Sequence, residues 1–164
     1  MTEAAKVREQ RVTAVHEAGH AVMTVIAGGE LELVVLDPPY TRSRVRRDER
    51  RIHIALAGPA AEHTYSKKSW LIQSAHGKSD DDLDAADAYL TEMGIASDEL
   101  GRYFWPGTKR ILNYWWPGVL HVADALLKQE SLNDAEVNQL LAHKMNGRPP
   151  ARRDLYDRLY WLKK

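Results

Sequence analysis

The first 29 residues impose the strongest structural constraint in this sequence. The apolar spacing predicts one helix from about residue 3 to residue 27, with apolar positions at Val12, Val15, Val22, Val25 and Ile26. The pair Gly28-Gly29 is typical of a helix end. Inside the helix, His16 and His20 are four residues apart, which corresponds to about 40° of rotation and about 6 Å of rise. Both imidazoles therefore point to the same side.

This spacing indicates a metal site. Two neutral imidazole nitrogens on one helix face can bind one zinc ion, which prefers tetrahedral nitrogen and oxygen ligands. Glu17 follows the first histidine and emerges beside the pair, where its carboxylate can act as the general base in a zinc metallopeptidase. The pattern is short and also arises by chance. Its neighbours are small or apolar, so buried histidines beside a carboxylate would be costly without a metal: Val15, Ala18, Ala21 and Val22.

Gly19 lies in the middle of the same helix. Glycine there costs about 1 kcal/mol relative to alanine. We therefore expect another segment to pack closely against the helix backbone at this residue.

The third metal ligand is left open by the residues alone. The metzincin pattern requires glycine and histidine where this chain has Met23 and Ile26, so that class is excluded. A downstream glutamate or aspartate on a helix is the other solution. Glu62 and the run Asp80-Asp81-Asp82 are the candidates.

Composition narrows the class of protein. The chain has 164 residues, of which 44% are hydrophobic, as expected for one globular domain. Lys+Arg and Asp+Glu both number 23, which argues against a general nucleic-acid binder. There is no cysteine, so disulfides and thiolate sites are excluded. The start lacks a signal peptide, and no apolar run approaches the roughly 20 residues of a membrane span, so we expect a cytoplasmic protein without a membrane partner.

The remaining pattern predicts a mainly α fold with a small β element. Residues 30–36 are the best strand candidate, and a short partner strand after Pro39 is conceivable. Residues 67–78 are expected to form a loop, and residues 94–107 are expected to be irregular. We expect one domain over 1–146, then a linker and C-terminal helix over 147–164. Helices are predicted at 48–64, 80–93, 109–128 (with a possible break at Pro117-Gly118), 133–143 and 154–163.

An ordered series of motifs resembles the zinc peptidase domain of the FtsH family. The series begins with His-Glu-Ala-Gly-His at 16–20 and covers roughly residues 8–143. The other motifs are Ala-Gly-x-Ala-Ala-Glu at 57–62, Ser-x-x-Asp-Leu-x-x-Ala at 79–86, Ser-Asp-x-Leu-Gly at 97–101 and Leu-Leu-x-x-Glu-Ser-Leu at 126–132.

The resemblance implies a single-domain zincin that hydrolyses peptide bonds in a peptide or protein substrate. It implies that His16 and His20 are zinc ligands and that Glu17 is the catalytic base. The third ligand would be the aspartate that precedes a hydrophobic residue in the downstream helix, which is best matched by Asp82 before Leu83, with Asp81 as the alternative.

The chain also departs from that family. It has no Walker A loop, and the resemblance begins near residue 1, so we expect a peptidase domain without the family's ATPase and transmembrane parts. A separate ATPase or a homo-oligomer would then be its partner. The segment after the first helix is shorter, and Pro59 stands where the family usually has arginine. These departures motivate an alternative function, a non-catalytic zinc-binding interaction or regulatory module. In a weaker alternative, the histidine motif is a coincidence in a helical partner protein.

Six arginines between residues 42 and 51 form the strongest local concentration of charge. We expect them to lie on a solvated loop and helix start, and the alternative is a contact for an acidic substrate or partner. They are Arg42, Arg44, Arg46, Arg47, Arg50 and Arg51.

Overall fold

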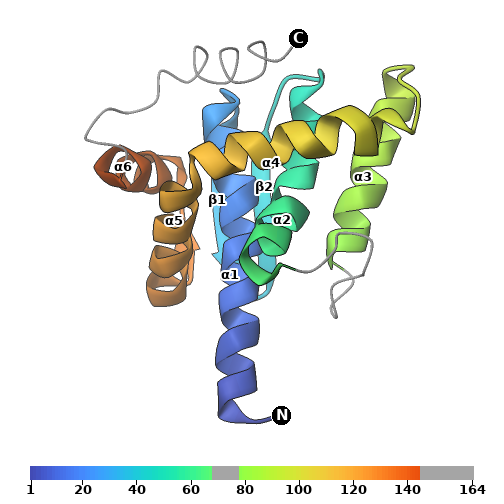
Figure 1. The fold of residues 1–164 in the computed structure, drawn as a ribbon. Coiled ribbons are helices and arrows are strands. Elements are labelled where there is room, and N and C mark those ends of the chain that lie inside the picture. Colours follow the sequence, from blue (N-terminus) through green and yellow to red (C-terminus); the bar gives the residue numbers. More distant parts are fainter. Residues whose placement is uncertain (68–77, 145–164) are drawn as a thin grey trace.

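The protein is a mainly helical single domain with a small three-stranded antiparallel sheet, as the sequence predicted (Figure 1). The computed structural model describes residues 1–67 and 78–144. The helices described are α1 (Glu3–Ile26), α2 (Arg50–Ser66), α3 (Lys78–Glu92), α4 (Trp105–Tyr114), α5 (Trp116–Gln129) and α6 (Asp134–Lys144). The strands are β1 (Glu30–Leu36), β2 (Pro39–Arg44) and β3 (Ser131–Leu132). A π-helical turn, η1 (Leu100–Phe104), leads into α4.

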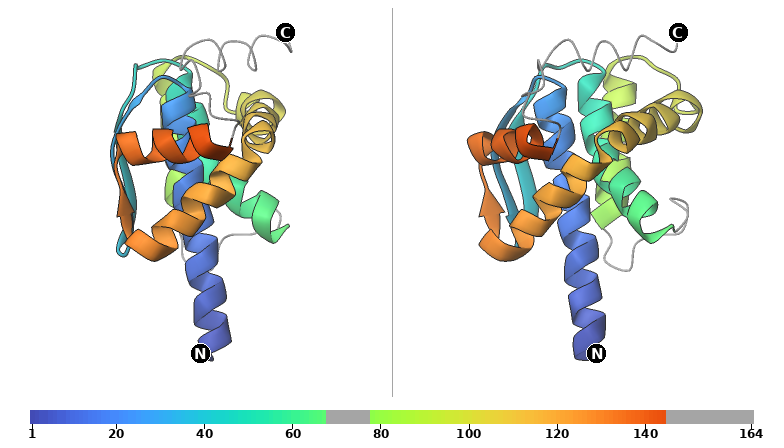
Figure 2. Two further views of the ribbon diagram at one scale, coloured as in Figure 1. Left: turned by 90° about the vertical axis from the view of Figure 1, so that its left-hand side faces the viewer. Right: turned by 60° about the vertical axis from the view of Figure 1, so that its left-hand side comes forward.

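Helix α1 is the central element. Its residues from Ala14 to Ile26 are all buried, while most of its first ten residues are exposed and project from the body (Figure 1). The sheet lies along one side of α1, and α2 packs against another (Figures 1 and 2). The histidine motif is on the buried half of α1, so the centre of the fold holds it rigidly.

The crossing of α1 and α2 is close, as the interior glycine of α1 predicted. A Cβ atom at Gly19 would lie 2.5 Å from the Ala57 carbonyl oxygen and 2.7 Å from the Ala61 Cβ. Both distances are too short for any side chain. Glycine at this position therefore lets the two helix backbones approach each other.

The sheet has the order β2-β1-β3. Strand β1 spans the predicted residues 30–36, and β2 is the short antiparallel partner after Pro39. Strand β3 was not predicted, and it pairs Leu132 with Val34. Within the described residues no strand pairs with the other edge of β2. Strand β2 is therefore an edge strand.

Two predictions about elements were wrong. The helix expected over 109–128 is two helices, and the break lies at buried Trp115 rather than at Pro117-Gly118. Pro117 instead occupies the first turn of α5, where a missing backbone N–H costs little. The stretch expected to be irregular holds η1 and the first turn of α4.

The prediction of a loop through the arginine group was also wrong in part. Arg42 and Arg44 belong to β2, and Arg50 and Arg51 begin α2. The loop over 67–78 and the segment 147–164 with its predicted helix lie outside the described residues, apart from Lys67 and Lys78 at the borders. None of the helices in the described part of the chain combines the length and apolar character that a membrane crossing requires.

Candidate metal centre

Three side chains from two helices converge on one point inside the fold. His16 and His20 of α1 are 3% and 8% exposed, and Asp82 comes from the first half of α3. The Nε2 atoms of the two histidines are 3.2 Å apart. Oδ2 of Asp82 lies 2.8 Å from Nε2 of His16 and 3.1 Å from Nε2 of His20. These residues form a group that can hold a metal ion.

The spacing of the three atoms suits a small tetrahedral ion. Around an ion with bonds of about 2.0–2.1 Å to nitrogen and oxygen, tetrahedral ligand atoms lie about 3.3 Å apart. The observed separations of 2.8, 3.1 and 3.2 Å are slightly shorter. The three ligand atoms would therefore need to move apart by only a few tenths of an ångström to accommodate the ion.

The other ring nitrogen of each histidine is held by an acceptor. Nδ1 of His16 lies 3.0 Å from Oε2 of Glu62, and Nδ1 of His20 lies 2.7 Å from the Ile54 carbonyl oxygen. A carbonyl and an ionised carboxylate only accept, so each Nδ1 donates its proton. Each neutral ring then presents the lone pair of Nε2 to the centre. This arrangement orients histidine ligands in metal proteins.

The electrostatics of the group favour a cation. Burial acts to lower the pKa of His20, but Asp82, Glu17 and the Ile54 carbonyl outweigh it and raise that pKa to about 9. Burial acts to raise the pKa of Asp82, but the two histidines hold it well below its ordinary value. In the absence of a metal, the neighbouring carboxylates thus favour a proton on His20. A metal ion would compete for the same position.

Glu17 is placed beside this group. Its side chain is buried, and its charge contributes to the raised pKa of His20. Thr41 of β2 donates a hydrogen bond of 2.8 Å from Oγ1 to Oε2 of Glu17. The carboxylate is thereby oriented by the edge strand.

Gly58 of α2 forms the wall of the centre. A Cβ atom at this position would lie 2.3 Å from Nε2 of His20 and 2.6 Å from Nε2 of His16. Any other residue would place its Cβ at the ligand atoms themselves. The absence of a side chain at residue 58 therefore creates the space that an ion needs.

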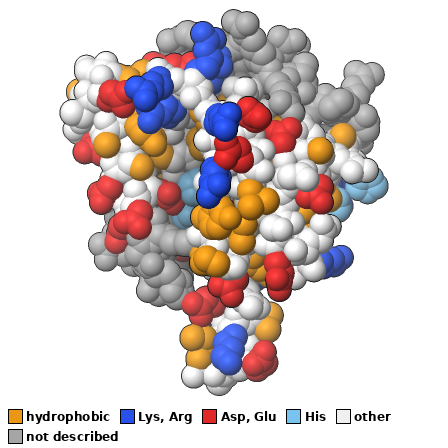
Figure 3. Space-filling view, turned by 180° about the vertical axis from the view of Figure 1, so that it is seen from behind, with side chains coloured by type: hydrophobic (Ala, Val, Ile, Leu, Met, Phe, Trp, Pro, Cys, Tyr) orange, Lys and Arg blue, Asp and Glu red, His pale blue; other side chains and the backbone are white. Residues whose placement is uncertain are grey.

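The centre opens into a groove of about 710 Å³. One side of the groove is β2, and the other is formed by the start of α2 and by α3. In the view from behind, a histidine surface lies in a hollow with Lys and Arg side chains beside it (Figure 3). Glu17, His16 and His20 all line the groove, so the centre is accessible from outside.

The structure distinguishes among the residues that the sequence offered as the third metal ligand. Asp82 reaches both imidazoles, whereas Asp81 is exposed on the groove wall and Glu62 contacts His16 at Nδ1, the ring nitrogen that points away from the centre. The sequence pattern did not indicate the roles of Thr41 and Ile54. Gly58 carried a signal, as an interior glycine of a helix.

Comparison with known proteins adds nothing to this geometry, since neither a family model nor a curated protein matches the chain.

Proposed function

We propose that this protein is a zinc-dependent metallopeptidase of the FtsH peptidase type. The observation that carries the proposal is the convergence of the Nε2 atoms of His16 and His20 with Oδ2 of Asp82, all within 3.2 Å of one another, beside the buried carboxylate of Glu17. The ordered motifs of the sequence support the family assignment. Two histidines and one carboxylate leave a tetrahedral zinc ion with one open position, which is typical of catalytic sites.

The chemistry divides between the ion and Glu17. A zinc ion held by the three ligands would supply Lewis acidity, which lowers the pKa of a water molecule and polarises a carbonyl oxygen. The carboxylate of Glu17 accepts a proton from the attacking water and later transfers it to the leaving amine. The hydroxyl of Thr41 holds that carboxylate in place, at 2.8 Å.

The substrate would bind as an extended strand. Among residues 1–67 and 78–144, no strand pairs with the outer edge of β2, which borders the groove, and an edge strand offers unpaired backbone N–H and C=O groups. A peptide that adds to this edge gains backbone hydrogen bonds and passes the metal centre. A groove of about 710 Å³ has room for several residues of such a peptide.

The first test measures metal content by elemental analysis on the wild type, Asp82→Ala and Asp81→Ala. We expect about one zinc ion per chain in the wild type, because the site has one set of three ligands. Asp82→Ala should lose the zinc, and Asp81→Ala is the matched control, since its exposed carboxylate is outside the ligand group. Zinc retained in Asp82→Ala would contradict the assigned ligand, and a wild type that takes up no zinc would contradict the metallopeptidase.

The second test separates catalysis from metal binding. Glu17→Gln preserves shape but removes the base, so we expect unchanged zinc content and a fall in peptide cleavage of about 10²- to 10⁴-fold. Cleavage is measured on fluorogenic peptides, with zinc content determined on the same samples. Unchanged cleavage in Glu17→Gln would exclude Glu17 as the base. If the zinc-loaded wild type cleaves no peptide or protein, the non-catalytic zinc-binding module becomes the better interpretation.

A further inference from the structure

The groove beside the metal centre has a basic wall that the proposed reaction does not use. Four arginines line it: Arg42, Arg44, Arg47 and Arg51. The side chains of Arg42 and Arg44 are 68% and 76% exposed. They share a single carboxylate, that of Glu32, which lies 2.7 Å from Nε of Arg44 and 3.9 Å from Nε of Arg42.

The other two arginines lie beyond the end of β2. Arg47 is exposed and makes no ion pair with any residue in the ranges 1–67 and 78–144. Arg51 is held across α2 and α3, with its guanidinium 3.9 Å from the ring centre of Tyr89 and 3.4 Å from Glu92. Arg51 is therefore partly neutralised, whereas in the described part of the chain Glu32 is the one carboxylate that pairs with Arg42 or Arg44, and none pairs with Arg47.

The carboxylates that line the groove do not balance this wall. Glu17 and Asp82 belong to the metal centre, and Asp81 lies on α3, across the groove from β2. In the view from behind, Lys and Arg side chains lie beside and above the hollow (Figure 3). Because Thr41 points to Glu17, the neighbouring Arg42 and Arg44 leave the opposite face of β2. A ligand that pairs with the edge of β2 therefore meets this positive charge on the strand face turned away from Glu17.

Two of the charged side chains, Arg42 and Arg44, occupy alternate positions of β2. Arg42 and Arg44 are two residues apart on one strand, so their side chains leave the same face of the sheet, about 7 Å from each other. In a peptide that pairs with β2, every second side chain lies on that face. Opposite charges on neighbouring strands attract each other. Two acidic side chains at positions i and i+2 of the peptide would therefore lie beside the two arginines.

We propose that the groove selects acidic peptides, namely extended segments that pair with β2 and carry aspartate or glutamate at alternate positions, on the strand face turned away from Glu17. Arg42 and Arg44 are the specificity-determining residues, and Arg47 extends the basic wall at the end of β2. That such a peptide is also cleaved rests on the proposed function. The binding itself does not, since it depends on β2 and its arginines.

The test measures binding by fluorescence anisotropy to zinc-loaded Glu17→Gln protein, in which bound peptide should stay intact. The probes are fluorescein-labelled octapeptides of alanine and leucine, with two central glutamates at i and i+2, two adjacent glutamates, or two glutamines. We expect the i, i+2 peptide to bind about 3- to 10-fold more tightly than the glutamine peptide, because each exposed ion pair contributes modestly. The adjacent pair should bind with intermediate affinity, and added salt should reduce the differences.

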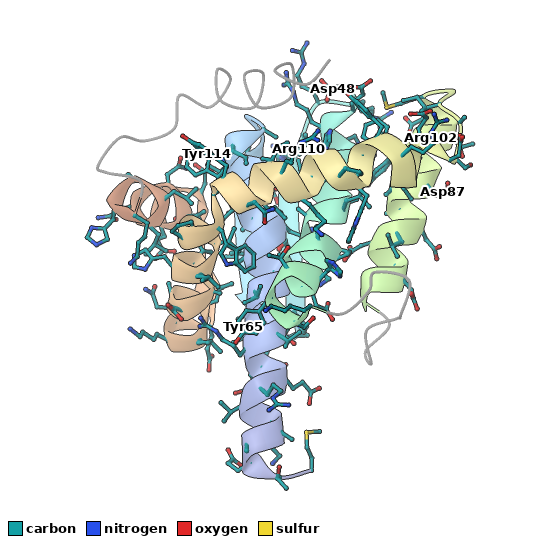
Figure 4. The ribbon with its side chains drawn as sticks, viewed as in Figure 1. Asp48, Tyr65, Asp87, Arg102, Arg110 and Tyr114 are labelled. Carbon is teal, nitrogen blue, oxygen red and sulfur yellow. The ribbon has the colours of Figure 1, made fainter. Side chains whose placement is uncertain are left out.

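Substitutions of single arginines or pairs of arginines show which side chains cause the preference for acidic peptides. The double variant Arg42→Gln/Arg44→Gln should lose the preference, and Arg47→Gln should weaken it. The matched control is Arg110→Gln, an exposed arginine on α4, which lies on the opposite side of the molecule from the view of Figure 3 and does not line the groove (Figure 4). Because all these side chains are solvent-exposed or nearly so, the variants should fold, and their melting temperatures check this.

The outcomes distinguish this inference from the proposed function. Equal binding of all peptides, no binding of any, or selectivity that survives in the double variant would overturn the acidic preference. Arginine-dependent binding without cleavage by the zinc-loaded wild type would support the groove and contradict the peptidase. Cleavage of peptides without any charge preference would support the peptidase and contradict the acidic preference of the groove.

Discussion

At the scale of single residues, Gly58 has the sharpest consequence. Helix interiors usually become more stable when glycine is replaced by alanine, by up to about 1 kcal/mol. At residue 58 the added Cβ would lie 2.3 Å from Nε2 of His20, which is too close for two non-bonded heavy atoms. The same change that favours the helix therefore displaces the ligand atoms. Helix propensity and the packing around the centre are therefore opposed at this position.

We expect Gly58→Ala to abolish or strongly weaken zinc binding, because the methyl group occupies the space between the two imidazoles and α2. Zinc affinity is measured by competition with a chromogenic chelator. Gly107→Ala is the matched control, since its Cβ would meet nothing closer than Cε1 of His53 at 3.4 Å and should leave zinc affinity unchanged. A Gly58→Ala protein with wild-type zinc affinity would show that the ion lies elsewhere.

At the scale of elements, the contact between α2 and α4 contains a buried histidine. His53 of α2 is fully buried, and its Nδ1 lies 2.8 Å from Oγ1 of Thr108 on α4. Burial lowers the pKa of His53 to about 3. The folded protein therefore keeps this ring neutral at pH values where an unfolded chain would protonate it.

This difference predicts acid sensitivity. Between the ordinary histidine pKa of about 6.5 and the folded value of about 3, the unfolded state binds one more proton, so stability falls as the pH falls. We expect His53 to contribute up to about 1.4 kcal/mol of lost stability per pH unit in this window. Urea unfolding at pH 7 and pH 5 measures this slope.

The matched variants are His53→Gln, which should have a shallower slope, and His143→Gln at an exposed position of α6, which should keep the wild-type slope. Because these variants all keep the residues of the metal centre, its contribution to the slope cancels when their slopes are compared with that of the wild type. Equal slopes in His53→Gln and the wild type would refute the assignment.

At the scale of the whole molecule, the metal centre connects segments that are distant in sequence. His16 and Asp82 are 66 residues apart, and the contacts of Glu62 and Ile54 bring α2 into the same group. Such a site does not exist in the unfolded chain, so the free energy of binding a metal ion there would stabilise the fold. This stabilisation would extend to α1, α2 and α3 together.

We expect zinc to raise the melting temperature and a chelator to lower it. At a free zinc concentration of 1,000 times Kd, the stabilisation is about 4 kcal/mol. Differential scanning calorimetry with zinc and with excess EDTA measures the shift. Asp82→Ala should show little or no zinc-dependent shift, and a shift of wild-type size in that variant would contradict a connection through Asp82.

The sequence by itself determined the features that depend on local spacing. The length of α1, the strand over residues 30–36 and the placement of His16, Glu17 and His20 on one side of a helix follow from periodicity and from the glycines at the helix end. Gly19 also signalled a close helix crossing, because an interior glycine is costly unless a backbone approaches it. The choice of Asp82 came from the resemblance of the motifs and not from spacing.

Only the tertiary structure decided which distant groups complete the centre. The Glu62 carboxylate and the Ile54 carbonyl fix the two imidazoles because α2 crosses α1 closely, and Thr41 reaches Glu17 because β2 pairs with β1 beside α1. The break at Trp115 likewise depends on where a large side chain is buried. Periodicity along a chain describes which way a side chain points, but its partners depend on how elements far apart in sequence pack against each other.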